Sequence, residues 1–315
     1  MIRFTEENGA LIARSRNEII RIEGWGNNAL RVRTTLLKKL PRDAHALTEN
    51  VAHSAKVTID ESSETAEIVN GKIKATVNGV GIICFYKDNE LILQEYYSYY
   101  YGSVRKEAIC YKIRSREYKG LASDDFKITV RFESDPKEKL FGMGQYQMPI
   151  LDLKGSVLPL EQRNSQVSVP FVVSNKGYGM LWNNPSTGEA AFGTNITKWI
   201  SDESDMVDYW ITADDTPAQI VTNYTECVGR APVMSKDYLG LWQCKLRYRT
   251  PDEVLEVARK YKELGIRLDV IVIDFFHWPH QGDWRFDEKY WSNVTYMPCD
   301  ESDDFIPQIP DHRVD

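Results

Sequence analysis

The sequence predicts an antiparallel β-sandwich followed by the beginning of a parallel (β/α)8 barrel, also called a TIM barrel. Three observations lead to this fold class. Apolar residues alternate over short runs with turn signals between them from residue 1 to about residue 235, only one helix interrupts those runs, and a helix between two apolar strands follows residue 236. Short strands without intervening helices are typical of sandwiches, whereas strands that alternate with helices are typical of parallel sheets.

The clearest strands of the predicted sandwich carry apolar residues at every second position. Ile73, Ala75 and Val77 alternate in this way, and the same spacing recurs over residues 126–132. Asn78-Gly79 is a strong hairpin signal, so we expect a turn there that leads into a strand at residues 80–86. The sandwich domain is therefore expected to occupy residues 1–235.

One helix is predicted near the end of the sandwich. Thr216 supplies an N-cap hydroxyl, Pro217 suits the first helical position, and Gln219 is a capping-box partner. We expect this helix to run through Tyr224.

The pattern changes after Met234. Residues 238–248 are expected to form a strand, residues 250–253 form a second capping box, and apolar residues then fall on one helical face as far as Leu264. Gly265 supplies a C-terminal cap, and residues 268–273 are nearly all apolar, as in the buried strands of parallel sheets. This βαβ unit, at residues 236–291, predicts the opening of a barrel. Only 75 residues follow Gly240, whereas a whole barrel takes about 250, so the barrel is expected to be incomplete.

Composition restricts the classes of partner. The formal net charge is −7 and no basic tract is present, which argues against nucleic acid because binding to its phosphates needs clustered Lys and Arg. No stretch approaches the roughly 20 apolar residues of a membrane span. Charged residues such as Arg14, Glu18 and Arg21 interrupt the first thirty residues and leave no apolar core for a signal peptide. We therefore expect no nucleic-acid or membrane partner and a cytoplasmic location.

Separate short segments carry a family resemblance from the sandwich into the βαβ unit. They are residues 140–145 (LFGMGQ), 169–171 (VPF), 177–185 (GYGMLWNNP), 209–211 (YWI), 216–217 (TP), 229–232 (GRAP), 240–248 (GLWQCKLRY) and 270–278 (VIVIDFFHW). In this order they resemble glycoside hydrolase family 31, over most of the chain up to about Trp291. Gln145 stands where many members have Glu. Residues 144–146 and 164–166 are most similar to the α-xylosidase branch.

The resemblance implies a galactose-mutarotase-like sandwich and hydrolysis of terminal α-linked sugars with retention of configuration, α-xylosides favoured and α-glucosides next. The implied partner is an oligo- or polysaccharide ending in α-linked xylose or glucose, without a cofactor. Retaining glycosidases use two carboxyl groups about 5–5.5 Å apart. The family takes them from its fourth barrel strand and from a position after its sixth. Neither strand is expected in this chain, so no residue receives a catalytic role and the chain itself is expected to be inactive.

The resemblance assigns sugar binding to Asp274, which ends the second barrel strand at the face where barrel active sites lie. An ionised carboxylate accepts charge-assisted hydrogen bonds from sugar hydroxyls. Phe275 and Trp278 follow, and aromatic faces suit the C–H surface of a pyranose. Phe275 is also a candidate to fill the space of the C6 hydroxymethyl group that distinguishes glucose from xylose. The alternatives are that Asp274 caps the next loop and that the aromatic rings fill the barrel mouth.

Two further functions stay open at this point. In one, the sandwich acts as a noncatalytic carbohydrate-binding or assembly module and the βαβ unit has no function of its own. In the other, His277 and His280 bind a metal together with Asp274 and Asp283. Pro279 argues against the metal because it prevents a regular helix that would present both imidazoles on one face. We therefore expect no metal site.

Residues 292–315 break with both the resemblance and the periodicity. The stretch from Asn293 onward has no helical apolar stripe, and it ends with Pro307, Pro310 and a run rich in acidic residues. We interpret it as an aberrant tail that arises from a frameshift or an assembly break near Trp291.

Overall fold

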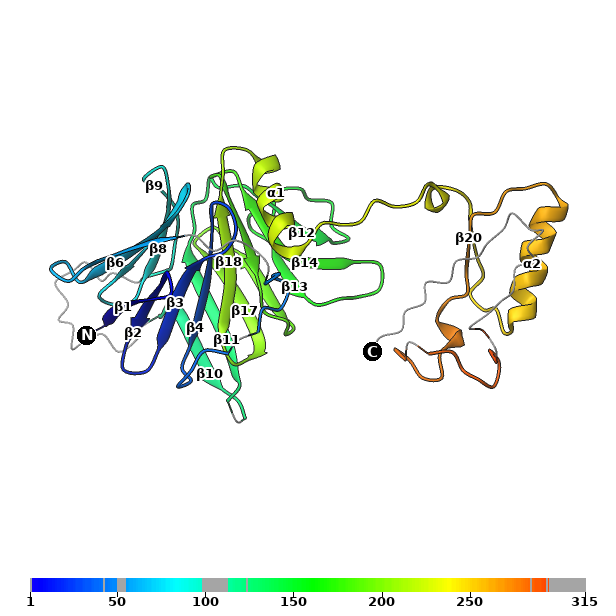
Figure 1. Cartoon of the computed structure of the whole chain (residues 1–315), viewed down its shortest axis with the longest axis horizontal. Helices are drawn as coiled ribbons and strands as arrows, with labels where there is room; N and C mark the ends of the chain where they lie inside the picture. The colour runs from blue at the N-terminus through cyan, green and yellow to red at the C-terminus, as the bar shows by residue number, and fades with distance from the viewer. Residues whose placement is uncertain are drawn as a thin grey trace. The chain divides into compact units, whose positions relative to one another are not determined.

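The chain forms two compact units, Met1–Arg230 and Ala231–Asp315 (Figure 1). The computed structural model describes residues 2–41, 43–49, 55–97, 113–122, 124–283, 285–292 and 294. The boundary that the sequence predicts, after residue 235, lies a few residues further along. Among the described residues, no helix has the length and apolar character that crossing a membrane requires.

The first layer of the N-terminal unit is an eight-stranded antiparallel sheet. Its strands, in spatial order, are β1 (Arg3–Glu7), β2 (Ala10–Arg14), β3 (Ile19–Gly24), β4 (Ala29–Thr35), β18 (Val207–Ala213), β15 (Tyr178–Trp182), β14 (Val167–Ser174) and β12 (Leu140–Gln145). The first four strands of the chain therefore make up one half of the sheet, and strands from much later in the sequence make up the other half.

Two five-stranded antiparallel sheets form the second layer. One has the order β10 (Arg116–Gly120), β11 (Phe126–Glu133), β17 (Ile196–Ser204), β16 (Gly188–Phe192) and β13 (Val157–Leu160). The other has the order β5 (Lys56–Asp60), β6 (Thr65–Asn70), β7 (Ile73–Asn78), β8 (Ile83–Lys87) and β9 (Glu90–Gln94). A bridge between Glu95 and Phe132 joins the two. The predicted antiparallel sandwich is confirmed.

The core lies between the layers and contains aromatic residues from all three sheets. Tyr209 of β18 packs edge-on against Phe85 of β8, with 6.2 Å between ring centroids, and against Phe132 of β11, with 5.8 Å. Trp182 of β15 stacks on Trp199 of β17 at 5.9 Å. All five side chains are buried. The three sheets therefore share one core.

The strands predicted from alternation are confirmed as β7 and β11, but the turn after β7 is longer than expected. The Asn78 side-chain oxygen accepts hydrogen bonds from the backbone N–H groups of Val80 and Ile82, at 3.2 and 3.0 Å. Gly81 has a φ of +86°, and β8 begins only at Ile83. The predicted start at Val80 is wrong because the Asn78 side chain closes a wider loop, whose left-handed residue is Gly81.

The predicted helix near the end of the sandwich is confirmed as α1 (Pro217–Val228). The Thr216 hydroxyl accepts a hydrogen bond from the backbone N–H of Gln219 at 3.3 Å, as the capping pattern predicts. The helix continues beyond the expected end at Tyr224 as far as Val228, and Gly229, whose φ is 95°, follows it. This extra turn buries Cys227 completely, and the helix ends where Gly229 provides a positive φ.

Helix α1 packs on the face of the eight-stranded sheet that is opposite to the main core. The Tyr224 ring stacks on Phe171 of β14 with 4.0 Å between centroids. A Cβ atom at Gly179 of β15 would lie only 2.5 Å from a methyl group of Ile220. The close approach of helix and sheet therefore requires glycine at residue 179.

The C-terminal unit contains a βαβ arrangement, as predicted. The short 3-10 helix η2 (Lys236–Leu239) precedes β19 (Trp242–Cys244), which is followed by α2 (Pro251–Glu263), β20 (Val270–Val272) and the 3-10 helix η3 (Phe275–His277). β19 and β20 are parallel neighbours. Both strands are shorter than the sequence predicts. Among the described residues each strand has only the other as a neighbour, and three residues of one strand pair with three of the other.

The ends of α2 follow the predicted capping signals. The Thr250 hydroxyl accepts from the Glu253 N–H at 3.4 Å, and the Glu253 carboxylate accepts from the Arg249 N–H at 2.7 Å. Gly265 has a φ of +66° just beyond the helix. The apolar face is less buried than expected, since Leu264 is 62% exposed.

A buried carboxylate directly after β18 is shared by several donors. Asp214 accepts hydrogen bonds from Lys72 Nζ at 2.7 Å, Asn28 Nδ2 at 3.0 Å, Asn223 Nδ2 at 3.2 Å and the Asp215 N–H at 2.9 Å. Burial raises the pKa of this group, but the hydrogen bonds outweigh burial and lower the pKa from 3.8 to about 2.

We expect Asp214→Asn to destabilise the N-terminal unit by about 2 kcal/mol at pH 7, because a lowered carboxyl pKa contributes stability while the group is ionised. This contribution is complete above the unfolded pKa of 3.8 and is lost as the pH falls through about 2. The measurement is urea unfolding of both proteins between pH 7 and pH 2. The matched control is Asp215→Asn, since that carboxyl is 56% exposed and should change stability much less. A stability difference for Asp214→Asn that stays constant with pH would contradict this assignment.

Candidate functional site

Asp274 lies just beyond the end of β20, in the C-terminal unit. In the parallel pair, Trp242 of β19 is opposite Val270 of β20, and Cys244 is opposite Val272. The carboxyl ends of both strands therefore lie at the same edge of the sheet. Active sites of (β/α)8 barrels are built at this edge, so Asp274 lies where a barrel places its functional side chains.

The backbone of Asp274 is strained, with φ 60° and ψ −179°. A non-glycine residue in this region costs about 1–3 kcal/mol, and such strain collects at functional sites. The Asp274 Oδ1 atom accepts a hydrogen bond from the Phe275 N–H at 2.7 Å, and the Nδ1 atom of His277 contacts the Asp274 carbonyl oxygen. One carboxylate oxygen therefore caps η3, as the alternative reading expects. The described part of the chain provides no hydrogen bond to Oδ2, which leaves that oxygen available to a hydroxyl group.

Aromatic rings lie next to Asp274 in the sequence and pack on one another. Phe275 stacks on Phe276 with 4.3 Å between centroids, and Trp278 lies 6.1 Å from Phe275. Phe275 and Phe276 are each 37% exposed. The rings thus support one another and still present part of their surface, so sugar binding by Phe275 and Trp278 stays a prediction.

Two polar residues of the C-terminal unit were not singled out from the sequence, and one of them lies beside these rings. The Arg247 guanidinium lies over the Phe276 ring, 4.2 Å from its centroid. The Gln243 side chain accepts from the Tyr261 hydroxyl at 2.6 Å and donates to the Tyr248 hydroxyl at 3.2 Å. Both residues belong to the segment 240–248 that carries the family resemblance. Spacing alone contains no signal for the contacts with Phe276 and Tyr261, because these two partners lie outside that segment.

The histidines of the alternative metal site have other surroundings. The His277 ring packs against Phe286 with 5.0 Å between centroids, and His280 is exposed. Asp283 forms an ion pair with Arg285 at 2.7 Å, and this pair lowers the pKa of Asp283. Within the described ranges, no group of three or more His, Cys, Asp or Glu side chains is arranged to hold a metal ion.

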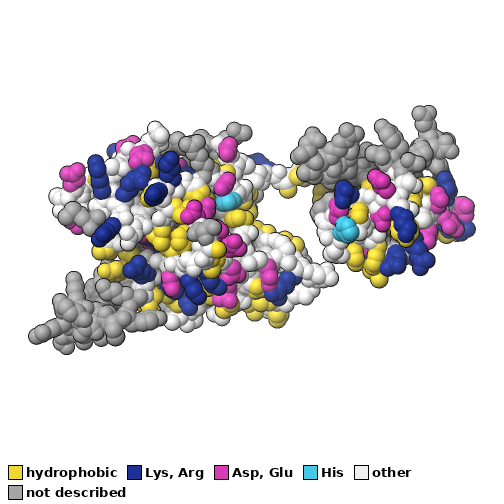
Figure 2. All heavy atoms as spheres, turned by 90° about the horizontal axis from the view of Figure 1, so that it is seen from below, with side chains coloured by type: hydrophobic (Ala, Val, Ile, Leu, Met, Phe, Trp, Pro, Cys, Tyr) yellow, Lys and Arg dark blue, Asp and Glu magenta, His cyan; other side chains and the backbone are white. Residues whose placement is uncertain are grey.

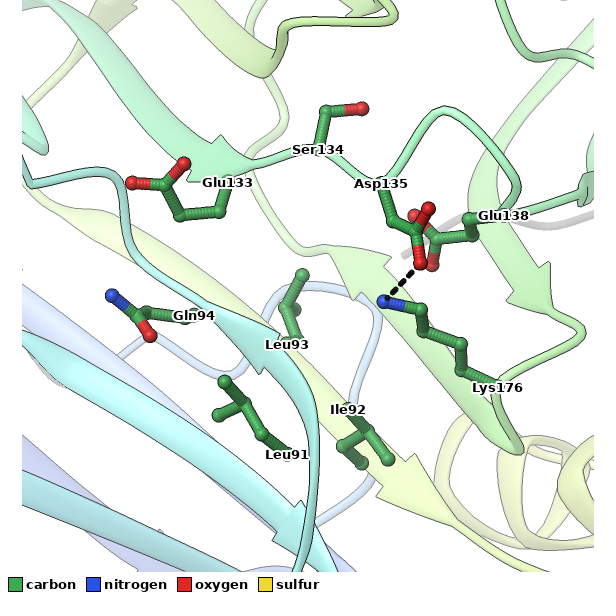
Figure 3. A pocket seen from close by; sticks show the side chains of 9 residues that line it. All are labelled: Leu91, Ile92, Leu93, Gln94, Glu133, Ser134, Asp135, Glu138 and Lys176. Atoms are coloured by element: carbon green, nitrogen blue, oxygen red, sulfur yellow. Dashed lines mark ion pairs between the residues drawn. The ribbon is translucent and has the colours of Figure 1, made fainter.

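A cavity lies in the N-terminal unit, between β9 and the segment that follows β11 (Figure 3). This cavity has a volume of about 160 Å³. Lys176 pairs there with Asp135 at 3.2 Å, and Glu138 accepts hydrogen bonds from the hydroxyls of Ser174 and Tyr178 at 2.6 and 2.7 Å. These charged groups satisfy one another, so the cavity gives no reason to expect a ligand.

Large apolar side chains are exposed over much of the C-terminal unit. They are Val233, Met234, Tyr238, Leu239, Leu241, Trp242, Leu246, Leu264, Ile266, Phe275, Phe276 and Tyr290. Figure 2 shows hydrophobic side chains of this unit at its surface, next to charged ones. In a closed barrel, further strands and helices cover such surfaces.

Two family models match this chain. Residues 19–190 match the glycosyl hydrolase 31 N-terminal galactose mutarotase-like domain, and residues 231–301 match the glycosyl hydrolases family 31 TIM-barrel domain. The first match alone covers more than half of the chain. The predicted fold class, a galactose-mutarotase-like sandwich followed by the start of a TIM barrel, is confirmed.

Known relatives carry glycosidase names. The chain is 45% identical over 306 residues to the uncharacterized family 31 glucosidase ORF2 of Pseudescherichia vulneris, covering 94% of this chain and 58% of that protein. It is 37% identical over 178 residues to α-xylosidase A of Aspergillus niger, covering 55% of this chain and 24% of that enzyme. A solved structure of a family 31 α-xylosidase from a soil metagenome, in complex with xylose, is 44% identical with a TM-score of 0.78, covering 92% of this chain and 44% of that one. The chain thus spans 58% or less of each relative's length.

One short match is to a different class of protein. A stretch of 25 residues is 72% identical to LL-diaminopimelate aminotransferase of Bacteroides thetaiotaomicron, covering 8% of this chain and 6% of that enzyme.

Proposed function

This chain belongs to glycoside hydrolase family 31, and on that premise we propose that it is part of a retaining α-glycosidase that removes terminal α-linked sugars, with α-xylosides preferred over α-glucosides. The observation that carries the proposal is Asp274 at the carboxyl end of the second strand of the βαβ unit. That carboxylate and its neighbouring aromatic rings lie where a barrel builds its substrate site.

The preference for xylose rests on two kinds of support. Relatives at 37% and 44% identity are named α-xylosidases, and the solved one contains xylose. In the proposed site, the Oδ2 atom of Asp274 accepts a hydrogen bond from a sugar hydroxyl, while Phe275 and Trp278 contact the C–H face of the pyranose ring. Phe275 then occupies the space that a C6 hydroxymethyl group needs. Glucose carries this group and would clash with the phenyl ring, whereas xylose lacks it.

The proposed reaction is a double displacement. A carboxylate attacks the anomeric carbon while a carboxylic acid protonates the departing glycosidic oxygen, and water then attacks the glycosyl-enzyme with the second group as base. Both carboxyl groups belong to barrel strands that follow β19 and β20. The 315-residue polypeptide therefore contributes substrate-binding groups and, by itself, no turnover.

The proposed function is tested on an enzyme with a whole barrel. The source DNA is read in all three frames beyond the codon of Trp291, and residues 1–291 are expressed in continuity with the frame that resumes the barrel. We expect this enzyme to hydrolyse an aryl α-xyloside with a higher kcat/KM than the matching aryl α-glucoside. A higher kcat/KM for the glucoside would refute the xylose preference, and inactivity on both would refute the glycosidase.

In this whole-barrel enzyme, Asp274→Ala is expected to lower kcat/KM for the aryl α-xyloside by about 10²–10³-fold. Loss of one charge-assisted contact that strengthens in the transition state has effects of this size. The matched control is Asp283→Ala, because that carboxylate is held by Arg285 and should change kcat/KM less than about threefold. Equal losses for the two variants would favour a purely structural role for Asp274. A loss confined to Asp283→Ala that metal addition reverses would favour the metal-dependent alternative.

We also propose that the last residues of the segment 292–315 do not belong to the barrel. The TIM-barrel family model matches as far as residue 301, so the departure falls after that residue. The match to the family 31 glucosidase leaves 6% of the chain uncovered, which is fewer than the 24 residues of this segment. Two unrelated coding sequences joined beyond residue 301 would account for the end of both matches. The same reading of the source DNA tests this, since an uninterrupted genomic read through codons 285–315 would make the segment native to the protein.

A further inference from the structure

A groove on the N-terminal unit gathers an excess of positive charge, in a protein whose net charge is −7. Its volume is about 380 Å³, and its lining includes Arg14, Arg21, Arg33, Lys38 and Lys39. The arginines come from the adjacent strands β2, β3 and β4, and the lysines come from the segment that follows β4. The groove has no residue in common with the site at Asp274.

Strand register places the groove on the face of the eight-stranded sheet that is opposite to the main core. Ile12, Arg21 and Arg33 lie opposite one another in a row across β2, β3 and β4. Their sequence neighbours Ile22 and Val32 belong to the core between the layers. Because side chains alternate between the two faces of a sheet, the arginines project away from that core.

Two of the arginines share a single carboxylate. Arg21 is directly opposite Arg33, an arrangement of like charges that is unfavourable by itself. Glu23 accepts from Arg21 Nε at 3.0 Å and from an Arg33 terminal nitrogen at 2.5 Å. The single negative charge of Glu23 therefore offsets only one of the two guanidinium charges.

Arg33 is the most deeply placed cation of the groove, with only 11% of its side chain exposed. One terminal nitrogen donates to the Pro41 carbonyl oxygen at 3.1 Å, but its Nε has no hydrogen-bond partner in the described part of the chain. Burial lowers the pKa of Arg33, and the positive charge of Arg31 lowers it further, against the opposing effects of Glu23 and Asp208. The groove thus holds a guanidinium whose charge and donors are incompletely satisfied.

The remaining cations are exposed to solvent. Arg14 forms a long pair with Glu7 at 3.4 Å, in which both side chains are 45% exposed. Lys38 and Lys39 are exposed, and neither has an ion pair with a described residue. Five cations therefore face Glu7 and Glu23. Asp208 lies opposite Arg33 in the sheet, but it already pairs with Arg31.

We propose that this groove binds a phosphate or sulfate group. Such an oxyanion carries two negative charges, which would offset most of the excess, and its oxygens accept charge-assisted hydrogen bonds from arginine and lysine. The volume leaves room for a sugar attached to the anion. The site is separate from sugar hydrolysis and does not depend on it.

The test is calorimetric titration of the 315-residue chain at low ionic strength with inorganic phosphate, glucose 6-phosphate and glucose. We expect saturable binding of both phosphates and none of glucose. Similar affinities for the two phosphates would identify a site for the free oxyanion, whereas at least tenfold tighter binding of glucose 6-phosphate would identify a sugar phosphate site. Absence of saturation by either phosphate would overturn the proposal.

Variants locate the binding to the groove. The double variant Lys38→Ala and Lys39→Ala is expected to weaken phosphate binding by about tenfold, because two exposed cations are removed from the site. The matched control, Lys119→Ala and Lys127→Ala, removes the same charge from the strands β10 and β11 and should leave the affinity within about twofold. Equal weakening by both pairs would mean that net charge alone attracts the anion, and the proposal would fail.

Discussion

The purified 315-residue chain is expected to release no xylose from an aryl α-xyloside above the uncatalysed rate. The proposed mechanism needs two carboxyl groups about 5–5.5 Å apart around the glycosidic bond, and enzymes owe rate accelerations of at least about 10⁶-fold to such arrangements. The described residues provide two parallel barrel strands, β19 and β20, and Asp274 as a single carboxylate at their end. A loss of at least 10⁶-fold relative to the whole-barrel enzyme is therefore expected in a continuous assay of the released phenol.

The α-xylosidase A of Aspergillus niger, which is 37% identical to the chain over 178 residues, is the positive control for this assay. If the chain shows no turnover, tryptophan fluorescence during titration with xylose distinguishes a chain that still binds the sugar from one that does not. Saturable quenching without turnover would favour the carbohydrate-binding module, whereas no quenching would mean that the isolated βαβ unit does not retain the sugar. Turnover by the isolated chain at enzymatic rates would show that the assignment of both catalytic groups to later strands is incorrect.

The second large effect is expected in the N-terminal unit, where Asp208→Ala should destabilise folding by about 3–5 kcal/mol. Asp208 and Arg31 form a buried pair, with oxygen–nitrogen distances of 3.1 and 2.6 Å and side chains no more than 1% exposed. Removing one partner of such a pair leaves the other charge buried without compensation. The substitution also removes the acceptor of the hydrogen bond that Asn183 donates to Asp208 at 2.8 Å. It frees Arg31 to move from its position 4.7 Å from the Trp25 ring centroid.

Urea unfolding followed by tryptophan fluorescence measures this change, because Trp25, Trp182, Trp199 and Trp210 are all buried in the N-terminal unit. The matched control is Asp202→Ala, which removes a carboxylate from the exposed pair with Lys127. That change should stay within about 0.5 kcal/mol. If the two substitutions had the same small effect, the buried pair would not be a significant source of stability.

The elements that the sequence predicts well are those whose cause is local. The hydroxyls of Thr216 and Thr250 cap α1 and α2 as expected, and Gly265 takes the left-handed conformation after α2. The alternating residues 73–77 and 126–132 form strands with buried inward side chains. Short-range hydrogen bonds and side-chain alternation determine these features, so the order of residues contains enough information to place them.

The features that the sequence misses depend on contacts between distant residues. Glu23 joins two arginines from neighbouring strands, Asp208 meets Arg31 across the same sheet, and Arg247 lies over Phe276. No spacing rule connects such pairs before the fold is known. The site at Asp274 was identified through resemblance rather than through local physics, and its strained backbone has no signature in residue order.

The central position of Tyr209 has a consequence for how the N-terminal unit comes apart. Its ring touches Phe85 on one five-stranded sheet and Phe132 on the other, while its own strand lies in the middle of the eight-stranded sheet. Neither five-stranded sheet can separate without exposing this shared aromatic centre to water. The sandwich should therefore melt as a single cooperative block, and a fragment that contains only one of its sheets should not remain folded.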